Sequence, residues 1–109
     1  MPRPAPLADI KIVDLTQVFA GPYCTYQLAR LGASVIKIEP PGGDPIRNWR
    51  EVKDGTSLWW RSLARNKKCI SLDLKTEEGR NIVRQLMINA DVVIENFRPG
   101  VLEGWQLDP

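Results

Sequence analysis

Short apolar runs rich in β-branched residues recur along the chain, and stretches with helical periodicity separate them. Each run is too short for a helix and is followed by polar or turn-forming residues, which is typical of buried strands in a parallel sheet. The pattern predicts strands over residues 10–15, 33–39, 69–74 and 92–95.

A first helix is expected after the turn of residues 16–22, because a proline at the first helical position sacrifices no hydrogen bond. Its apolar face is predicted to carry Cys24, Leu28 and Leu31 at helical spacing. Gly32 is placed to end this helix before the second strand.

A second long helix is expected to begin at Thr76, whose hydroxyl suits an N-cap. One apolar stripe runs along it: Ile82, Val83, Leu86, Met87 and Ala90. Shorter helices are expected around residues 57–64 and 101–105. Because strands and helices alternate, the predicted fold class is α/β, with a Rossmann-like, largely parallel sheet and flanking helices.

The composition fits one ordinary globular domain of 109 residues, 43% of them hydrophobic and 26% charged. Every apolar run falls short of the roughly 18–20 residues that span a bilayer, so no membrane partner is expected. No secretory signal is visible, which predicts a cytoplasmic protein, or one of an organelle matrix in a eukaryote. The chain has no histidine, and its two cysteines lack metal-ligand spacing, so no metal site is predicted.

Basic residues gather in the middle of the chain, with seven Lys/Arg against three Asp/Glu over residues 41–68. Such a segment suits an anionic ligand, and a solvated basic loop is an equally good interpretation. The aromatic residues there are not regularly interleaved with the basic ones, and no nucleic-acid motif is present. Nucleic acid is therefore not expected as a partner.

Four predicted strand ends carry a carboxylate: Asp14, Glu39, Asp73 and Glu95. Capping or hydrogen-bonding roles are the more ordinary interpretation of such acids than acid–base catalysis. Glu39 also suits the ribose of a dinucleotide, although the glycine fingerprint of that fold is missing. No histidine activates either thiol, so both cysteines are expected to be structural and buried.

Residues 92–100 predict a buried strand that runs into a polar loop, where Pro99 and Gly100 force a turn. Open α/β sheets place their ligands at strand ends of this kind. Taken alone, the residues indicate an anionic, nucleotide-like ligand and no defined reaction.

Several motifs in a consistent order carry a resemblance to a known family: residues 13–16, 20–22, 31–42, 66–68, 72–75 and 95–100. From about residue 7 to residue 107, the chain closely resembles the N-terminal portion of the family III CoA-transferases. That family includes formyl-CoA:oxalate, succinyl-CoA:dicarboxylate and carnitine CoA-transferases, together with the related α-methylacyl-CoA racemases. The retained residues 66–68 and the long 41–64 connection resemble the transferase branch more than the racemase branch.

The resemblance implies that coenzyme A binds a Rossmann-like large domain, of which residues 1–109 are the N-terminal part, in a homodimer of interlocked chains. It places the CoA contacts in the first turn and after the third and fourth strands: Phe19, Ala20, Leu72, Asp73, Leu74, Lys75, Asn96, Phe97 and Arg98. Backbone N–H groups suit a pyrophosphate, cations offset phosphate charge, and an aromatic ring packs on adenine or pantetheine. The alternative is a core Phe97 and a solvated Lys75.

The implied reaction moves CoA between an acyl-CoA thioester and a small carboxylic acid. In the family an aspartate attacks the thioester, and the reaction passes through mixed-anhydride and aspartyl-CoA intermediates. The resemblance places this aspartate beyond the equivalent of Pro109, so no catalytic residue is assigned within the chain. The 109-residue chain is therefore expected to be inactive alone.

Three alternatives stay open. The first is a truncated, non-catalytic protein that binds CoA or associates with a full-length chain. The second is a fragment of an acyl-CoA racemase. The third is an unrelated nucleotide-binding domain that uses Glu39 on a ribose.

Three positions depart from the family pattern. Phe19 stands where formyl-CoA transferases commonly have glutamine, which disfavours formyl-CoA and oxalate as substrates. Pro40 and Gly104 stand where arginines are common. The lost phosphate contacts would fall to other arginines: Arg47, Arg50 or Arg98.

Overall fold

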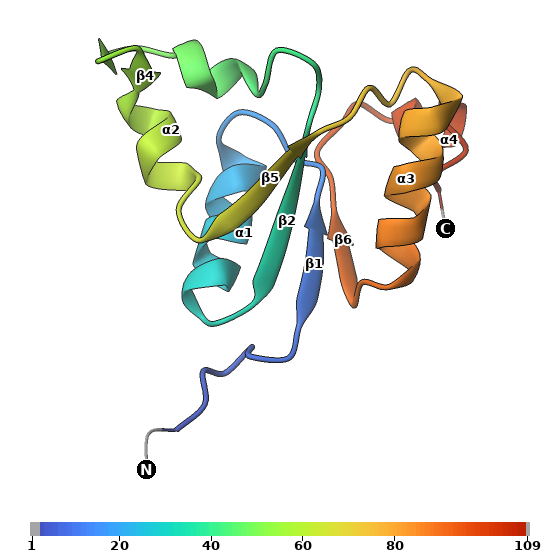
Figure 1. Cartoon of the computed structure of the whole chain (residues 1–109), viewed down its shortest axis with the longest axis horizontal. Coiled ribbons are helices and arrows are strands. Elements are labelled where there is room, and N and C mark those ends of the chain that lie inside the picture. Colours follow the sequence, from blue (N-terminus) through green and yellow to red (C-terminus); the bar gives the residue numbers. More distant parts are fainter. Residues whose placement is uncertain (1–2, 109) are drawn as a thin grey trace.

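The computed structural model describes residues 3–108. Within them, the strands β1 (Lys11–Asp14), β2 (Ser34–Glu39), β5 (Lys67–Ser71) and β6 (Val92–Ile94) form a four-stranded sheet in the order β5-β2-β1-β6 (Figure 1). All of its strand pairs are parallel, and helices supply the crossovers that parallel pairing requires. The α/β class and the Rossmann-like parallel sheet are confirmed.

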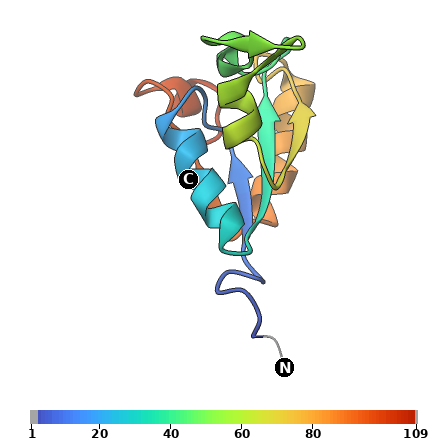
Figure 2. The same ribbon diagram turned by 90° about the vertical axis from the view of Figure 1, so that its left-hand side faces the viewer.

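Helices cover both faces of this sheet. The helix α1 (Ala20–Arg30) packs against one face and α3 (Glu77–Ile88) against the other, with the sheet between them (Figure 2). The short helix α4 (Val101–Gly104) follows β6 and joins the α3 side through Leu102 and Trp105. The result is a layered α/β/α arrangement with one apolar cluster on each face of the sheet.

The long connection between β2 and β5 contains short elements near the α1 side. They are the 3₁₀ helix η1 (Pro45–Asn48), the strands β3 (Val52–Lys53) and β4 (Thr56–Ser57), and the helix α2 (Leu58–Leu63). The short helix predicted around residues 57–64 is confirmed as α2.

The β3–β4 hairpin was not predicted, although the sequence contains its signal. Asp54 and Gly55 form the two-residue turn, and both have positive φ, 52° and 77°. An Asp-Gly pair favours this kind of hairpin turn because both residues tolerate the left-handed region. The flanking strands are only two residues long, so no alternating pattern marks them.

The third strand of the main sheet begins and ends earlier than predicted. β5 covers Lys67–Ser71 rather than 69–74, because Lys67 already pairs with Val35 of β2. Leu72 still donates its N–H to the Glu39 carbonyl oxygen at 2.9 Å, and the chain then turns away from the sheet. The segment between β5 and α3, residues 72–76, therefore forms a loop at the carboxyl edge.

The buried face of α1 differs from the predicted apolar stripe. Cys24 is exposed and Leu31 is 45% exposed, whereas the buried residues of the helix are Pro22, Thr25 and Ala29. A polar contact orients the helix, because the Thr25 hydroxyl donates to the buried Asp14 carboxylate at 2.6 Å. Apolar periodicity alone cannot locate such a face.

The expected burial of the two thiols is also wrong, since Cys24 and Cys69 are both free and exposed.

The apolar stripe predicted for α3 agrees better with the structure than the stripe predicted for α1. Val83 is fully buried and Leu86 packs against the same core, but Ile82 is 47% exposed.

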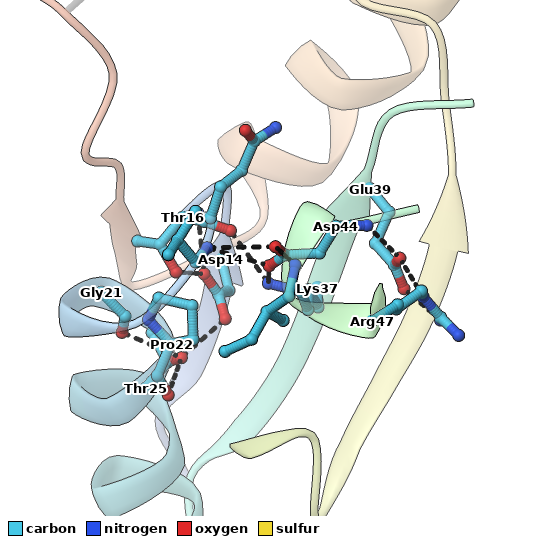
Figure 3. Close-up of polar contacts among 12 residues, drawn as sticks. Asp14, Thr16, Gly21, Pro22, Thr25, Lys37, Glu39, Asp44 and Arg47 are labelled. Carbon is cyan, nitrogen blue, oxygen red and sulfur yellow. Dashed lines mark hydrogen bonds and ion pairs between the residues drawn. The ribbon is translucent and has the colours of Figure 1, made fainter. Parts of the chain in front are cut away.

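Four charged side chains lie buried between α1, the sheet and η1, and we call Asp14, Lys37, Asp44 and Lys67 the buried charge cluster. Lys37 Nζ lies 2.9 Å from Asp44 Oδ2 (Figure 3), and Lys67 Nζ lies 3.2 Å from Asp14 Oδ2. Each of these side chains is at most 1% exposed. Removing two ion pairs from water is costly, so these charges are stable only if their other hydrogen bonds are satisfied.

Hydroxyl and backbone groups satisfy them. The Thr16 N–H donates to Asp14 Oδ1 at 2.9 Å, and the Thr16 and Thr25 hydroxyls both donate to the same carboxylate. Lys37 Nζ donates to the Thr16 carbonyl oxygen at 2.9 Å, and Lys67 Nζ donates to that of Pro22 at 3.0 Å. Among the described residues, no buried side-chain nitrogen or oxygen lacks a partner.

The strands themselves explain why the cluster lies at one end of the sheet. Side chains two residues apart share a face, so Ile12 and Asp14 both face α1, as do Val35 and Lys37. On that face the sheet is apolar toward its amino edge and charged toward its carboxyl edge. The cluster therefore lies beneath the loops that leave β1 and β2.

A third ion pair borders the cluster. Glu39 accepts two hydrogen bonds from Arg47, both at 2.7 Å, and one from the Asp44 N–H at 2.9 Å. Burial by itself would raise the pKa of Glu39, but these partners outweigh it and lower the pKa. The Arg47 guanidinium also stacks 3.7 Å from the ring centre of Trp60, which ties α2 to η1.

Within residues 3–108, no helix is long and apolar enough to cross a membrane.

Replacing Asp14 by asparagine tests the buried charge cluster. The substitution keeps the shape of the side chain but leaves Lys67 buried without its counter-charge, so the free energy of unfolding is expected to fall by about 3–5 kcal/mol. Urea unfolding followed by circular dichroism measures the change. As a control, Asp54→Asn in the exposed hairpin turn is expected to stay within about 0.5 kcal/mol of the parent chain. Equal effects of the two substitutions would contradict the role of the cluster.

The Glu39–Arg47 pair predicts a pH dependence of stability. Because the folded-state pKa of Glu39 is lower than its ordinary value of 4.5, its charge stabilises the folded chain fully above that value. This contribution is lost as the pH falls through the lowered pKa. The stability difference between the parent chain and Glu39→Gln is therefore expected to be larger at about pH 7 than at about pH 3.

Urea unfolding at both pH values measures this difference. Repeating the comparison in an Arg47→Gln background should remove most of the pH dependence, because the main partner is gone. A difference that stays constant or grows in acid would show that the pair does not stabilise the fold.

Candidate functional site

The order of the strands creates a switch point between β1 and β6. From β1 the chain moves outward through β2 to β5, and it then returns to the other side of β1. Loops that leave two such neighbouring strands diverge, and open α/β sheets bind ligands in the crevice that this leaves at the carboxyl edge. In Figure 1 this is the upper edge of the sheet.

A pocket of about 280 Å³ lies at this edge, among residues of the α3-side core. Its walls come from the carboxyl ends of the four sheet strands and from the residue that ends α4. It is lined by Gln17, Ile38, Glu39, Pro40, Pro41, Leu72, Asp73, Leu74, Lys75, Phe97 and Trp105.

The structure brings together the predicted site residues that follow β5 and one that follows β6. Residues 72–75 and Phe97 face the same pocket, although they lie far apart in sequence. Leu74 is buried, Lys75 is exposed, and Phe97 is half-buried. The Phe97 ring packs edge-on against Trp105, with ring centroids 5.4 Å apart. Phe97 is thus both part of the core and part of the pocket wall.

The other predicted contacts do not line this pocket: Phe19, Ala20, Asn96 and Arg98. Ala20 begins α1, and Arg98 is exposed in the loop before α4. Phe19 is 42% exposed and contacts Tyr23 and Trp59, with ring centroids 6.1 and 5.0 Å away. None of these four residues belongs to the pocket wall.

A tight turn places Lys75 at the start of α3. Asp73 Oδ1 accepts the Lys75 N–H at 3.0 Å, and the Thr76 hydroxyl donates to the Asp73 carbonyl oxygen at 2.7 Å. Thr76 also accepts the Gly79 N–H at 3.1 Å, which confirms it as the N-cap of α3. A Cβ at Gly79 would lie 2.1 Å from the Asp73 carbonyl oxygen, so this approach requires glycine.

Thr16, Gln17 and Val18 follow β1 after one intervening residue, Leu15, and we call these three residues the β1 turn. A side chain remote in sequence binds the backbone of each of them. Lys37 binds the Thr16 carbonyl oxygen, as described above. The Asn96 side chain accepts the Gln17 N–H and donates to the Gln17 carbonyl oxygen, both at 2.9 Å. Asn96 therefore links the loops that follow β1 and β6.

Val18 completes the β1 turn in an unfavourable conformation. Its φ is +72°, a left-handed value that a β-branched residue rarely adopts. Its N–H donates to both carboxylate oxygens of Asp44, at 3.1 and 3.2 Å. The buried charge cluster thus supports the strained residue directly.

Three charged residues line the pocket: Glu39, Asp73 and Lys75. Among the described residues that line it, Lys75 carries the positive charge. Glu39 is neutralised by its two hydrogen bonds with Arg47, and its pKa is lowered, so it stays an ionised partner of that arginine. The carboxylate that a dinucleotide fold would offer to a ribose is therefore already occupied.

Sequence reasoning missed several lining residues: Gln17, Pro40, Pro41 and Trp105. The proline pair directly after β2 was a usable signal, because it ends a strand at the ligand edge. Nothing in the local pattern marks Trp105, which reaches the pocket only because α4 folds back onto the α3 side.

Residues 3–108 contain no group of three or more His, Cys, Asp or Glu side chains arranged to hold a metal ion.

Comparison with known proteins shows similarity to one family of enzymes, by a family profile and by individual relatives. A profile of CoA-transferase family III matches residues 7–109. Succinyl-CoA–D-citramalate CoA-transferase of Chloroflexus aurantiacus is 53% identical over 106 residues, which cover 95% of this chain and 26% of that enzyme. Succinyl-CoA:mesaconate CoA-transferase of Haloarcula hispanica is 48% identical over 102 residues, covering 89% of this chain and 26% of the relative.

The structural comparison agrees. A crystal structure of a CAIB/BAIF family protein from Brucella suis matches with a TM-score of 0.90 and 41% identity, over 98% of this chain and 30% of that one. The chain spans about a quarter of the length of the curated relatives it matches, 26% for both enzymes named above. Since the family profile covers nearly all of its residues, the chain belongs to CoA-transferase family III.

Proposed function

We propose that this chain supplies the CoA-binding part of a CoA-transferase that moves CoA between an acyl-CoA thioester and a small carboxylic acid. The observation that carries the proposal is the pocket at the carboxyl edge of the sheet, where residues 72–75 and Phe97 converge. The relatives support the reaction class, because the two enzymes named above are CoA-transferases with succinyl-CoA in their names.

The pocket suits one section of CoA rather than the whole molecule. Its volume of about 280 Å³ is at the lower limit for small-molecule sites. Leu72, Leu74 and Phe97 offer an apolar wall for the adenine ring or the pantetheine arm. Lys75 at the rim offers its ammonium group to a phosphate. The rest of the coenzyme would follow the carboxyl edge toward the β1 turn and Arg98.

The family resemblance implies an aspartate nucleophile and a homodimer, and we propose both for the complete enzyme. Neither is a property of the pocket itself. The 109 residues then bind and orient the coenzyme, and other parts of the enzyme carry the aspartyl-CoA chemistry. A cytoplasmic location stays a prediction.

A non-catalytic CoA-binding protein is the second candidate, because such a protein would bind CoA in the same pocket as a CoA-transferase. A racemase fragment would also bind CoA here. The dinucleotide alternative is disfavoured, because Glu39 is held by Arg47 and is only 4% exposed.

Titration with CoA tests the pocket. Isothermal calorimetry of the 109-residue chain is expected to show saturable CoA binding. Lys75→Ala should weaken this binding by about tenfold or more, because it removes a charge-assisted contact to phosphate. Lys53→Ala, a lysine on the exposed hairpin, is the matched control and should bind like the parent chain. An absence of saturable binding, or preference for NAD over CoA, would contradict the proposal.

Activity assays test whether the 109-residue chain binds CoA without catalysing its transfer. The purified 109-residue chain is expected to give no detectable exchange of CoA between succinyl-CoA and a free carboxylate, because the proposed nucleophile lies elsewhere. Mass spectrometry of the thioester pool with isotope-labelled acid measures the exchange. Turnover above a no-protein blank would show that the chain is a complete catalyst and that the proposal places the nucleophile wrongly.

A further inference from the structure

The β1 turn is fixed at each of its three residues by a side chain from another part of the chain. Lys37 holds the Thr16 carbonyl oxygen at 2.9 Å, Asn96 holds both backbone groups of Gln17, and Asp44 holds the Val18 N–H. A turn that served only to connect β1 to α1 would need no such set of remote contacts.

The conformation of Val18 shows that the turn is held rather than relaxed. Left-handed backbone is unfavourable for a β-branched residue, and glycine adopts it freely. Strained residues of this kind persist only where the surroundings over-determine them, and they cluster at functional sites. Here the surroundings are Asp44, which is 1% exposed, and its buried partner Lys37.

The held turn forms part of the pocket wall. Gln17 lines the pocket, and it directly precedes Val18. Asp44 also accepts the Ile46 N–H at 3.0 Å and donates its own N–H to Glu39, another lining residue. One buried residue, through its carboxylate on Val18 and its backbone N–H on Glu39, therefore connects two walls of the pocket.

We propose that Asp44, paired with Lys37, is a positioning residue of the CoA site: it holds Val18 in its left-handed conformation and thereby sets the place of Gln17 at the pocket. The proposal rests on the proposed function for its link to CoA. Its structural part, the energetic coupling between Asp44 and Val18, stands independently of the ligand.

A double-mutant cycle tests the coupling. Asp44→Asn weakens the hold on the turn, and Val18→Gly removes the need for it. We expect Asp44→Asn to lower the melting temperature in both backgrounds, because Lys37 loses its buried counter-charge in both. The loss is expected to be several degrees smaller in the Val18→Gly background, and that difference measures the coupling. Asp54→Gly is the matched control, because Asp54 also has a positive φ, 52°, but lies in the exposed hairpin. Equal losses in the Val18→Gly and Asp54→Gly backgrounds would overturn the proposal.

Binding tests the functional part. Asp44→Asn is expected to weaken CoA binding by about tenfold, and Val18→Gly, but not Asp54→Gly, is expected to restore most of it. Restoration by neither glycine, or unchanged binding in Asp44→Asn, would refute the positioning role while leaving CoA binding intact. If the parent chain binds no CoA, the proposed function fails, and the positioning role of Asp44 in CoA binding fails with it. The double-mutant cycle of melting temperatures still tests the coupling between Asp44 and Val18.

If Asp44→Asn does not fold, the single glycine variants decide the structural part. Glycine relieves more strain at a valine than at an aspartate, which tolerates the left-handed region. Val18→Gly is then expected to melt at a higher temperature than Asp54→Gly, and the opposite order would refute the held turn.

Discussion

Two buried ion pairs at the carboxyl end of the sheet, Lys37 with Asp44 and Lys67 with Asp14, connect most of the elements that surround the pocket. Such pairs are weak sources of net stability, because the cost of dehydrating the charges is large. Their value lies in specificity, since a displaced element would leave a charge buried and unpaired. We infer that they fix how α1, β5 and η1 meet the first two strands.

The pocket depends on this arrangement indirectly. Its wall consists largely of loops, and loops hold a defined shape only where their backbone groups have partners. After β1 those partners are Lys37, Asn96 and Asp44, and after β5 they are Asp73 and Thr76. The apolar core on the α3 side then supplies the floor through Leu74 and Phe97. Polar contacts therefore shape the pocket, and apolar packing anchors it.

Periodicity predicted the sheet strands, the two long helices and the fold class, because those elements bury apolar faces. It failed at polar determinants: the face of α1 follows Thr25, and β5 begins at Lys67, a buried lysine. A lysine between two isoleucines, as at Lys37, was a signal of a buried charge that went unused. Residues 72–75 and Phe97 share one pocket because strand ends converge by topology. Gln17 and Trp105 could not be assigned to it, because their placement depends on tertiary contacts between distant segments.

The central claim, that CoA occupies the pocket at the carboxyl edge of the sheet, is tested most directly by mapping where the coenzyme binds the folded chain. Two-dimensional ¹⁵N–¹H spectra of the labelled 109-residue chain, recorded while CoA is added, give that map. The account predicts saturable shifts of the amide signals of Gln17, residues 72–75 and Phe97, with the β3–β4 hairpin unchanged. Saturable shifts confined to other surfaces, or none at all, would contradict it.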